Sequence, residues 1–215
     1  MDSPKDSRIR TSYDKLAVEY ARRIYTELDH KPFDRQQLDN LGILVREQGP
    51  VVDLGCGPGQ VARYLIDRGV KAFGLDLSYG MLVEAQKLNA EVAFIEGNML
   101  ALPIASNQLA GVIAFYSIIH LDRGRIVDAF SEMFRVLRLG GHALLAFHLG
   151  DDVLHTSELW GHKVDLDATF FNTKEITHGL MLAGFKIEAA VERDPYPPEV
   201  EYQSRRGYIL AEKPG

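Results

Sequence analysis

One stretch decides the fold: Val51-Val52-Asp53-Leu54-Gly55-Cys56-Gly57-Pro58-Gly59-Gln60, which predicts a short buried strand, a glycine-rich turn and the start of a helix. Glycines at positions 55, 57 and 59 permit positive φ and let a ligand approach the backbone, because no Cβ stands in the way. We therefore predict a turn that cradles a ligand. A tight strand-to-helix turn that binds nothing is the structural alternative.

The sequence around this stretch alternates between short apolar runs and helical patterns, which is typical of a parallel sheet covered by helices. We predict strands at 51–54, 71–76, 92–96, 111–116, 142–148, 185–193 and 207–212. We predict helices at 60–67, 79–88, 123–137 and from about 173, with two more, at 13–28 and 34–45, ahead of the sheet. A proline-containing loop joins the last two strands, so the last strand should run antiparallel. The expected fold class is α/β, with a doubly wound, seven-stranded, mostly parallel sheet.

The composition limits the classes of function. With 215 residues, of which 46% are hydrophobic and 25% charged, the chain suits one buried core, and we expect a single domain. No apolar run reaches the ~20 residues of a membrane helix, and the first ten residues are polar, so we expect no membrane association and a cytoplasmic location. The net charge of -6 gives no attraction to a phosphate backbone, and we expect no nucleic-acid partner.

Metal and disulfide chemistry are not expected. Cys56 is the single cysteine, so it can form neither an internal disulfide nor a cysteine zinc site. His155 and His162 are seven residues apart and have no local set of further ligands. We predict no metal site.

The acidic residue that follows the glycine turn narrows the class of ligand. A dinucleotide fingerprint needs a third glycine where Gln60 stands, so NAD is only the second choice. Asp76 lies about 20 residues beyond the turn, at the end of the next predicted strand, where a carboxylate can accept both hydroxyls of a ribose. We predict a nucleoside-bearing ligand. The alternative is that Asp76 only caps the helix that follows.

Several segments resemble the class I S-adenosylmethionine (SAM)-dependent methyltransferases. Asp53-Leu54-Gly55-Cys56-Gly57-Pro58-Gly59 resembles motif I of that family, and Gly74-Leu75-Asp76-Leu77-Ser78 resembles the motif after it. Two further segments are similar to the next parts of the family pattern: Glu96-Gly97-Asn98-Met99 and Phe115-Tyr116-Ser117-Ile118-Ile119-His120-Leu121. Tyr13-Asp14-Lys15-Leu16-Ala17-Val18-Glu19-Tyr20 resembles, more weakly, the lid helix of the methyltransferase type 11 (UbiE-like) subgroup. The likeness runs from about Val51 to Phe147 and implies a Rossmann-like sheet.

The resemblance implies SAM as cofactor and S-adenosylhomocysteine (SAH) as product. It implies that the loop backbone and Asp53 hold the methionine end, that Asp76 binds the ribose, and that Asn98 and Met99 meet the adenine, although the family more often has Asp at position 98. The residues to which it assigns cofactor binding are Tyr13, Tyr20, Asp53, Gly55, Cys56, Gly57, Asp76, Leu77, Met81, Gly97, Asn98, Met99, Tyr116 and Ser117. The domain would divide into lid helices (1–48), a SAM-binding core (49–148) and an acceptor-side segment with the closing strands (149–215).

Catalysis would depend mainly on alignment, because SAM already carries a sulfonium leaving group. His120 follows the fourth predicted strand and His148 ends the fifth, so either could remove a proton from the acceptor; a structural role is the alternative for each. Tyr13 and Tyr20 share one face of a helix, where they either close over the donor or pack the helix on the sheet. The segment 149–171 is where acceptor specificity usually lies in the family, and 194–202 either lines the acceptor pocket or stiffens a hairpin.

The predicted function is in-line transfer of a methyl group from SAM to an O, C or N nucleophile of a small molecule. The segment 115–118 lacks the Asn- or Asp-Pro-Pro-aromatic motif of enzymes that methylate nucleobase amino groups, which disfavours DNA. A protein or RNA methyltransferase, an NAD-dependent oxidoreductase and an inactive SAM-binding regulator are the alternatives. We expect a monomer or a homodimer.

Overall fold

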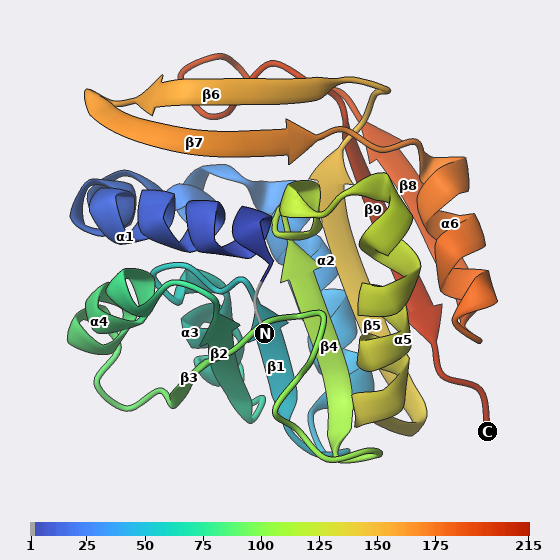
Figure 1. Cartoon of the computed structure of the whole chain (residues 1–215). Coiled ribbons are helices and arrows are strands. Elements are labelled where there is room, and N and C mark those ends of the chain that lie inside the picture. Colours follow the sequence, from blue (N-terminus) through green and yellow to red (C-terminus); the bar gives the residue numbers. More distant parts are fainter. Residues whose placement is uncertain (1–2) are drawn as a thin grey trace.

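A seven-stranded sheet with the order β3-β2-β1-β4-β5-β9-β8 forms the centre of the computed structural model, which describes residues 3–215 (Figure 1). Its strands are β1 (Val51–Leu54), β2 (Ala72–Asp76), β3 (Phe94–Glu96), β4 (Leu109–Phe115), β5 (Leu137–His148), β8 (Lys186–Arg193) and β9 (Arg206–Glu212). Neighbouring strands from β3 to β5 are parallel, whereas β9 runs antiparallel to both β5 and β8. The predicted Rossmann-like, mostly parallel sheet with an antiparallel last strand is confirmed.

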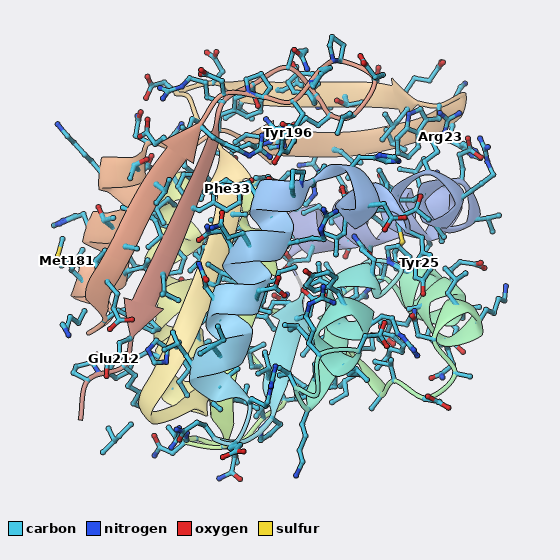
Figure 2. The ribbon with its side chains drawn as sticks, turned by 180° about the vertical axis from the view of Figure 1, so that it is seen from behind. Arg23, Tyr25, Phe33, Met181, Tyr196 and Glu212 are labelled. Carbon is cyan, nitrogen blue, oxygen red and sulfur yellow. The ribbon has the colours of Figure 1, made fainter. Side chains whose placement is uncertain are left out.

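Helices cover both faces of this sheet. On one face lie α2 (Pro32–Val45) and α3 (Gln60–Ile66), and on the other lie α5 (Ile126–Val136) and α6 (Thr173–Leu182). Figure 2, seen from behind, shows α2 crossing in front of the sheet. Successive side chains of a strand point to opposite faces, so Val51 packs with the α2 cluster and Val52 with the α5 cluster. The helix α4 (Tyr79–Leu88) lies beside β2 and β3.

Helix α1 (Pro4–Ile24) begins earlier and ends earlier than the predicted helix at 13–28. Ser3 caps it: the Ser3 hydroxyl accepts from the Asp6 amide at 3.1 Å, and the Asp6 carboxylate accepts from the Ser3 amide at 2.8 Å. Pro4 occupies the first helical position, where a missing N–H costs nothing. After Ile24 the chain continues as a 3-10 turn, Glu27–His30, so the helix prediction was wrong at both boundaries.

A β-hairpin occupies most of the segment 149–171, for which no strand was predicted. It consists of β6 (Val153–Leu159) and β7 (His162–Thr169), joined at Trp160 and Gly161, which both have positive φ. The alternation Val164-Asp165-Leu166-Asp167-Ala168 was a usable strand signal, because one face is apolar and the other polar. The apolar face packs on α1, and Figure 1 shows the hairpin lying over that helix.

Candidate active site

A cavity of about 520 Å³ lies at the carboxyl ends of β1, β2 and β4, with α1 and the hairpin in its wall. Ligands of open α/β sheets bind at this edge, because the chain leaves the sheet there in loops that can carry functional groups. All sixteen predicted cofactor and catalytic residues line the cavity: Tyr13, Tyr20, Asp53, Gly55, Cys56, Gly57, Asp76, Leu77, Met81, Gly97, Asn98, Met99, Tyr116, Ser117, His120 and His148. The structure thus brings residues from six separate segments of the chain into one site.

The glycine turn has the backbone that its sequence predicts. Gly55, Gly57 and Gly59 all have positive φ, at 67°, 50° and 83°. A Cβ on Gly55 would lie 2.4 Å from the Cβ of Ser117, so this glycine also allows the turn to approach the end of β4. A Cβ on Gly57 would stand 3.6 Å from the ring of Tyr20, which places the turn directly beneath α1.

Two buried carboxyl groups face the cavity beside this turn. Asp76 accepts from the amides of Gly57 at 2.9 Å and Ser78 at 2.8 Å, which fixes both of its oxygens at the end of β2. Burial raises the pKa of Asp76 to about 6, although these hydrogen bonds oppose the shift. Burial and the neighbouring Asp76 raise the pKa of Asp53 to about 8. The pair therefore favours a cationic or hydrogen-bond-donating ligand.

Three buried oxygens in the cavity wall have no hydrogen-bond partner among residues 3–215: Asp53 Oδ2, Gln60 Oε1 and Ser117 Oγ. An unsatisfied buried polar atom costs about 1 to 3 kcal/mol, so native structures keep few of them without a functional reason. Asp53 lies in β1, Gln60 begins α3, and Ser117 follows the end of β4. Their placement indicates a polar ligand at this side of the cavity.

His120 joins three elements of the site. Its Nδ1 lies 3.0 Å from the carbonyl oxygen of Asp167, which can only accept, so Nδ1 carries the ring proton. Its Nε2 lies 2.7 Å from the hydroxyl of Tyr13, which consequently donates to it. Burial lowers the pKa of His120 to about 4, and the ring is neutral at pH 7. This chain of hydrogen bonds ties α1 to the end of β4 and to the hairpin.

The other end of α1 reaches Asn98. The side-chain amide of Asn98 donates to Asp6 at 3.2 Å, and its oxygen accepts from the Leu100 amide at 2.9 Å. These contacts orient the Asn98 side chain, while Met99 adds an apolar surface to the same part of the cavity. The arrangement can receive a flat, partly polar group such as a purine.

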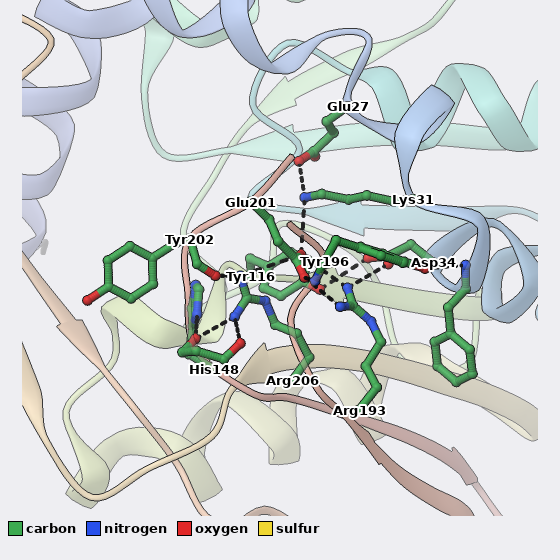
Figure 3. A network of polar contacts seen from close by, with 12 residues as sticks. Glu27, Lys31, Asp34, Tyr116, His148, Arg193, Tyr196, Glu201, Tyr202 and Arg206 are labelled. Carbon is green, nitrogen blue, oxygen red and sulfur yellow. Dashed lines mark hydrogen bonds and ion pairs between the residues drawn. The ribbon is translucent and has the colours of Figure 1, made fainter. Parts of the chain in front are cut away.

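A network of charged side chains, which sequence analysis did not predict, supports the opposite side of the cavity (Figure 3). Arg193 donates to Glu201 at 2.5 and 3.1 Å and to Asp34, at the start of α2, at 3.1 Å. The hydroxyls of Tyr116 and Tyr208 also donate to Asp34, at 3.1 and 3.0 Å. Partners such as Asp34 and Arg193 are 159 positions apart, so no local pattern could have revealed them.

His148 lies in an aromatic group at this side. Its ring stacks on Phe170 with centroids 5.1 Å apart, lies 5.5 Å from Tyr116 and 5.9 Å from Tyr202, and its Nδ1 is 2.6 Å from the hydroxyl of Ser204. Burial, with Arg206 nearby, lowers the pKa of His148 to about 3. The ring is therefore neutral and closely packed.

The loop 194–202 contributes to the cavity, as one of its two predicted alternatives required. Glu199, Glu201 and Tyr202 line the cavity. Tyr196 does not; its hydroxyl accepts from the Phe33 amide at 2.9 Å, and Figure 2 shows the two residues side by side.

Two further kinds of feature are absent from residues 3–215. No group of three or more His, Cys, Asp or Glu side chains is arranged to hold a metal ion. None of the helices in this range has the length and apolar character needed to cross a membrane.

Comparisons with known proteins agree with this site. Residues 51–141 match the family model described as a methyltransferase domain. The chain is 30% identical over 147 residues to a malonyl-[acyl-carrier protein] O-methyltransferase of Enterobacter lignolyticus, covering 67% of this chain and 58% of that protein. It is 33% identical over 112 residues to a demethylmenaquinone methyltransferase of Beutenbergia cavernae, covering 52% and 45%. The chain thus spans about half the length of these curated relatives.

The fold is also that of a solved protein whose name describes another reaction. The structure of the [4+2]-cyclase SpnF superposes with a TM-score of 0.76 at 15% identity, over 100% of this chain and 98% of that one. At this identity the likeness concerns the fold alone. The fold by itself therefore does not identify the reaction that this chain catalyses.

Proposed function

Because the chain belongs to the class I SAM-dependent methyltransferases, we propose that it transfers the methyl group of SAM to a nucleophilic O, C or N atom of a small molecule. The observation that carries this proposal is the set of unpartnered oxygens, on Asp53, Gln60 and Ser117, beside the ribose-binding position of Asp76. SAM offers an ammonium group and two ribose hydroxyls, which are the donors that such a set lacks.

The residues present fit the cofactor of this family. The carboxylate of Asp76 has two oxygens with about four acceptor sites, so the amides of Gly57 and Ser78, one on each oxygen, leave capacity for the ribose hydroxyls. Asp53 and the backbone of Gly55 and Gly57 would hold the methionine end. Asn98 would accept from the adenine amino group, and Leu77, Met81 and Met99 would pack on the ring system. When bound, SAM supplies a methyl group on a positively charged sulfur.

The chain itself would contribute alignment and exclusion of water. Tyr13 and Tyr20, with ring centroids 5.7 Å apart, extend from α1 over the glycine turn and close the cavity above the donor. The neutral Nε2 of His120 would take a proton from an acceptor hydroxyl or amine once the Tyr13 hydroxyl turns away from it. His148 would shape the acceptor side by packing, because both its stacking and its hydrogen bond hold it in place.

The proposed roles divide along the chain. Of the predicted lid helices (1–48), only α1 would close over the cavity, because α2 packs on a face of the sheet; residues 49–148 would hold most of the cofactor, and 149–215 would contribute to the acceptor side. The names of the two relatives support a small acceptor group, since one concerns malonyl-[acyl-carrier protein] and the other demethylmenaquinone. The cavity supports it as well, because α1 and the hairpin enclose the site.

Calorimetric titration with SAH and with NAD tests the cofactor assignment. We expect SAH to bind and NAD not to bind. Asp76→Ala should weaken SAH binding about 5- to 150-fold, because it removes a charged acceptor worth about 1 to 3 kcal/mol. Asp128→Ala is the matched control, since Asp128 is exposed on α5 and pairs only with Arg125. Unchanged SAH affinity in a folded Asp76→Ala protein would refute the ribose assignment.

Turnover tests the reaction itself. The protein is incubated with methyl-labelled SAM and separate small-molecule, protein and RNA fractions of a cell extract. We expect label to appear in the small-molecule fraction, and less of it with the Asp76→Ala variant. Label in protein or RNA instead would contradict the small-molecule acceptor, and SAH binding with no transfer to any fraction would indicate a regulator.

A further inference from the structure

One part of the cavity wall has features that the cofactor does not explain. We call it the acceptor wall, and it consists of Lys31, Tyr116, His148, Tyr202 and Arg206, all of which line the cavity. Three of these side chains are aromatic and two are cationic. Lys31 and Arg206 are both buried, at 6% and 2% exposure, which is unusual for their residue types.

Arg206 has an unused donor in this wall. One guanidinium nitrogen donates to the carbonyl and hydroxyl of Ser204, and the other donates to the carbonyl of Tyr202 at 2.7 Å. The third, Nε, is buried and has no partner among residues 3–215. Figure 3 shows Arg206 beside Tyr202 and His148. A buried guanidinium N–H without an acceptor is costly, so an acceptor group brought by a ligand would stabilise it.

The charge of Arg206 is also incompletely balanced. Glu201 is the nearest carboxylate, at 3.5 Å, but Arg193 takes both of its oxygens and the Tyr196 amide donates to it at 2.7 Å. Lys31 pairs with Glu27 at 2.6 Å and stands 4.0 Å from Glu201. Arg193 is thus the close partner of Glu201, and Arg206 lacks one of its own.

Lys31 and Arg206 both lie close to the Tyr116 ring in the cavity wall. Arg206 Cζ lies 5.5 Å and Lys31 Nζ lies 5.4 Å from the centre of the Tyr116 ring. After burial itself, these two residues are the next causes that lower the pKa of His148. Glu201 acts on the pKa of His148 in the opposite sense but less strongly than either cation, so the net field of these three groups at the His148 ring is positive.

We propose that the acceptor wall binds a carboxylate and that the methyl acceptor is a small carboxylic acid with a planar or unsaturated body. One carboxylate oxygen would accept from Arg206 Nε, Lys31 would add its charge, and the rings of Tyr116, His148 and Tyr202 would contact the carbon body. A carboxylate suits the wall because it is a charged acceptor, and the Nε–H of Arg206 is a charged donor without an acceptor among residues 3–215. This inference rests on the proposed function, which supplies the methyl donor.

Benzoate and its neutral counterpart benzamide test the wall directly. The protein is first titrated with SAH, and the SAH complex is then titrated with each compound. We expect benzoate to bind at least about tenfold more tightly than benzamide, because the amide carbonyl can still accept from Arg206 Nε but lacks the negative charge that strengthens this hydrogen bond and attracts Lys31. Equal affinities in the wild-type protein, or tighter binding of phenyl phosphate than of benzoate, would overturn the carboxylate assignment. Failure of SAH to bind would instead refute the proposed function.

Two neighbouring arginines provide the matched variants. Arg206→Gln should abolish the preference for benzoate and leave SAH affinity unchanged. Arg205→Gln should keep the preference, because Arg205 is exposed and pairs with Glu192 and Asp194 outside the cavity. If Arg206→Gln does not fold, the benzoate affinity of Lys31→Gln is measured instead. We expect this variant to bind benzoate severalfold more weakly than the wild-type protein does. The proposal would be contradicted if Arg206→Gln still preferred benzoate over benzamide. It would also be contradicted if Lys31→Gln kept both this preference and the wild-type affinity for benzoate.

Discussion

The two sides of the cavity are built in different ways. The cofactor side depends on the glycine turn and Asp76, whose hydrogen bond to Gly57 joins positions only 19 apart. The acceptor side depends on ion pairs such as Arg193–Asp34 and on hydrogen bonds such as Tyr208–Asp34, which join positions 159 and 174 apart. The first side is a local structure that a strand and a helix position. The acceptor side forms only when Asp34, near the start of the chain, meets Arg193 and Tyr208 in its last strands.

The two sides also differ in how completely their polar groups are satisfied. The cofactor side leaves oxygens of Asp53 and Ser117 without partners, whereas nearly every oxygen of Asp34 and Glu201 on the acceptor side is bonded. Unsatisfied groups bind ligands, and satisfied networks hold a shape. Changes in the Arg193 network should therefore affect stability first, whereas changes on the cofactor side and at Arg206, whose Nε has no partner among residues 3–215, should affect binding first.

Arg193→Met should have the largest effect. It leaves Asp34 and Glu201 buried without their main cationic partner, and loss of one partner of a buried ion pair costs about 3 to 5 kcal/mol. Denaturant unfolding measures the change. Arg205→Met, at an exposed pair, should change stability by about 0.5 kcal/mol or less. A loss below about 1 kcal/mol in Arg193→Met would show that the network does not carry the stability of the acceptor side.

Gly55→Ala should come next and should affect both stability and binding. The new methyl group would meet Ser117 at 2.4 Å at a φ of 67°, and we expect a loss of about 2 to 4 kcal/mol together with most of the SAH affinity. Gly161→Ala separates the two causes, because φ is 81° there but no atom lies near the new Cβ. That control should lose only about 1 to 2 kcal/mol and keep its SAH affinity. Similar SAH binding in both variants would argue against close packing at Gly55.

The pH dependence of SAH binding should be the smallest effect. Burial and Asp76 raise the pKa of Asp53 to about 8, so Asp53 is protonated at pH 7 in the free protein. The ammonium group of SAH favours the carboxylate form, so binding should release a proton, and affinity should rise from pH 6 to 8 by at most about tenfold per unit. Calorimetric titration in buffers of different ionisation enthalpy measures the number of protons released when SAH binds. Asp53→Asn should remove the slope above pH 7, where Asp76, whose pKa is raised to about 6, is already ionised, and a flat profile above pH 7 in the wild-type protein would contradict this role for Asp53.

Much of the fold could be predicted from the sequence because its signals are local. Each strand of the main sheet follows from a short apolar run, and the turn follows from glycines whose φ no other residue adopts easily. The early start of α1, with Ser3, Pro4 and Asp6, and the alternation in β7 were local as well, and both were overlooked. Both signals are present in the sequence, since each of these elements is specified within a few residues.

The chemical state of the site residues was decided by tertiary structure. The sequence determined that Asp53, Asp76 and His120 stand at strand ends, since strand positions follow from hydrophobic patterning. Only the folded chain brings the Asp167 carbonyl to His120, 47 positions away, and thereby selects the ring tautomer. Only the folded chain surrounds Glu201 with Arg193 and leaves Arg206 with a free donor. Burial and ion pairing depend on distances in space. No periodic pattern in the sequence identifies the partner of a charged residue.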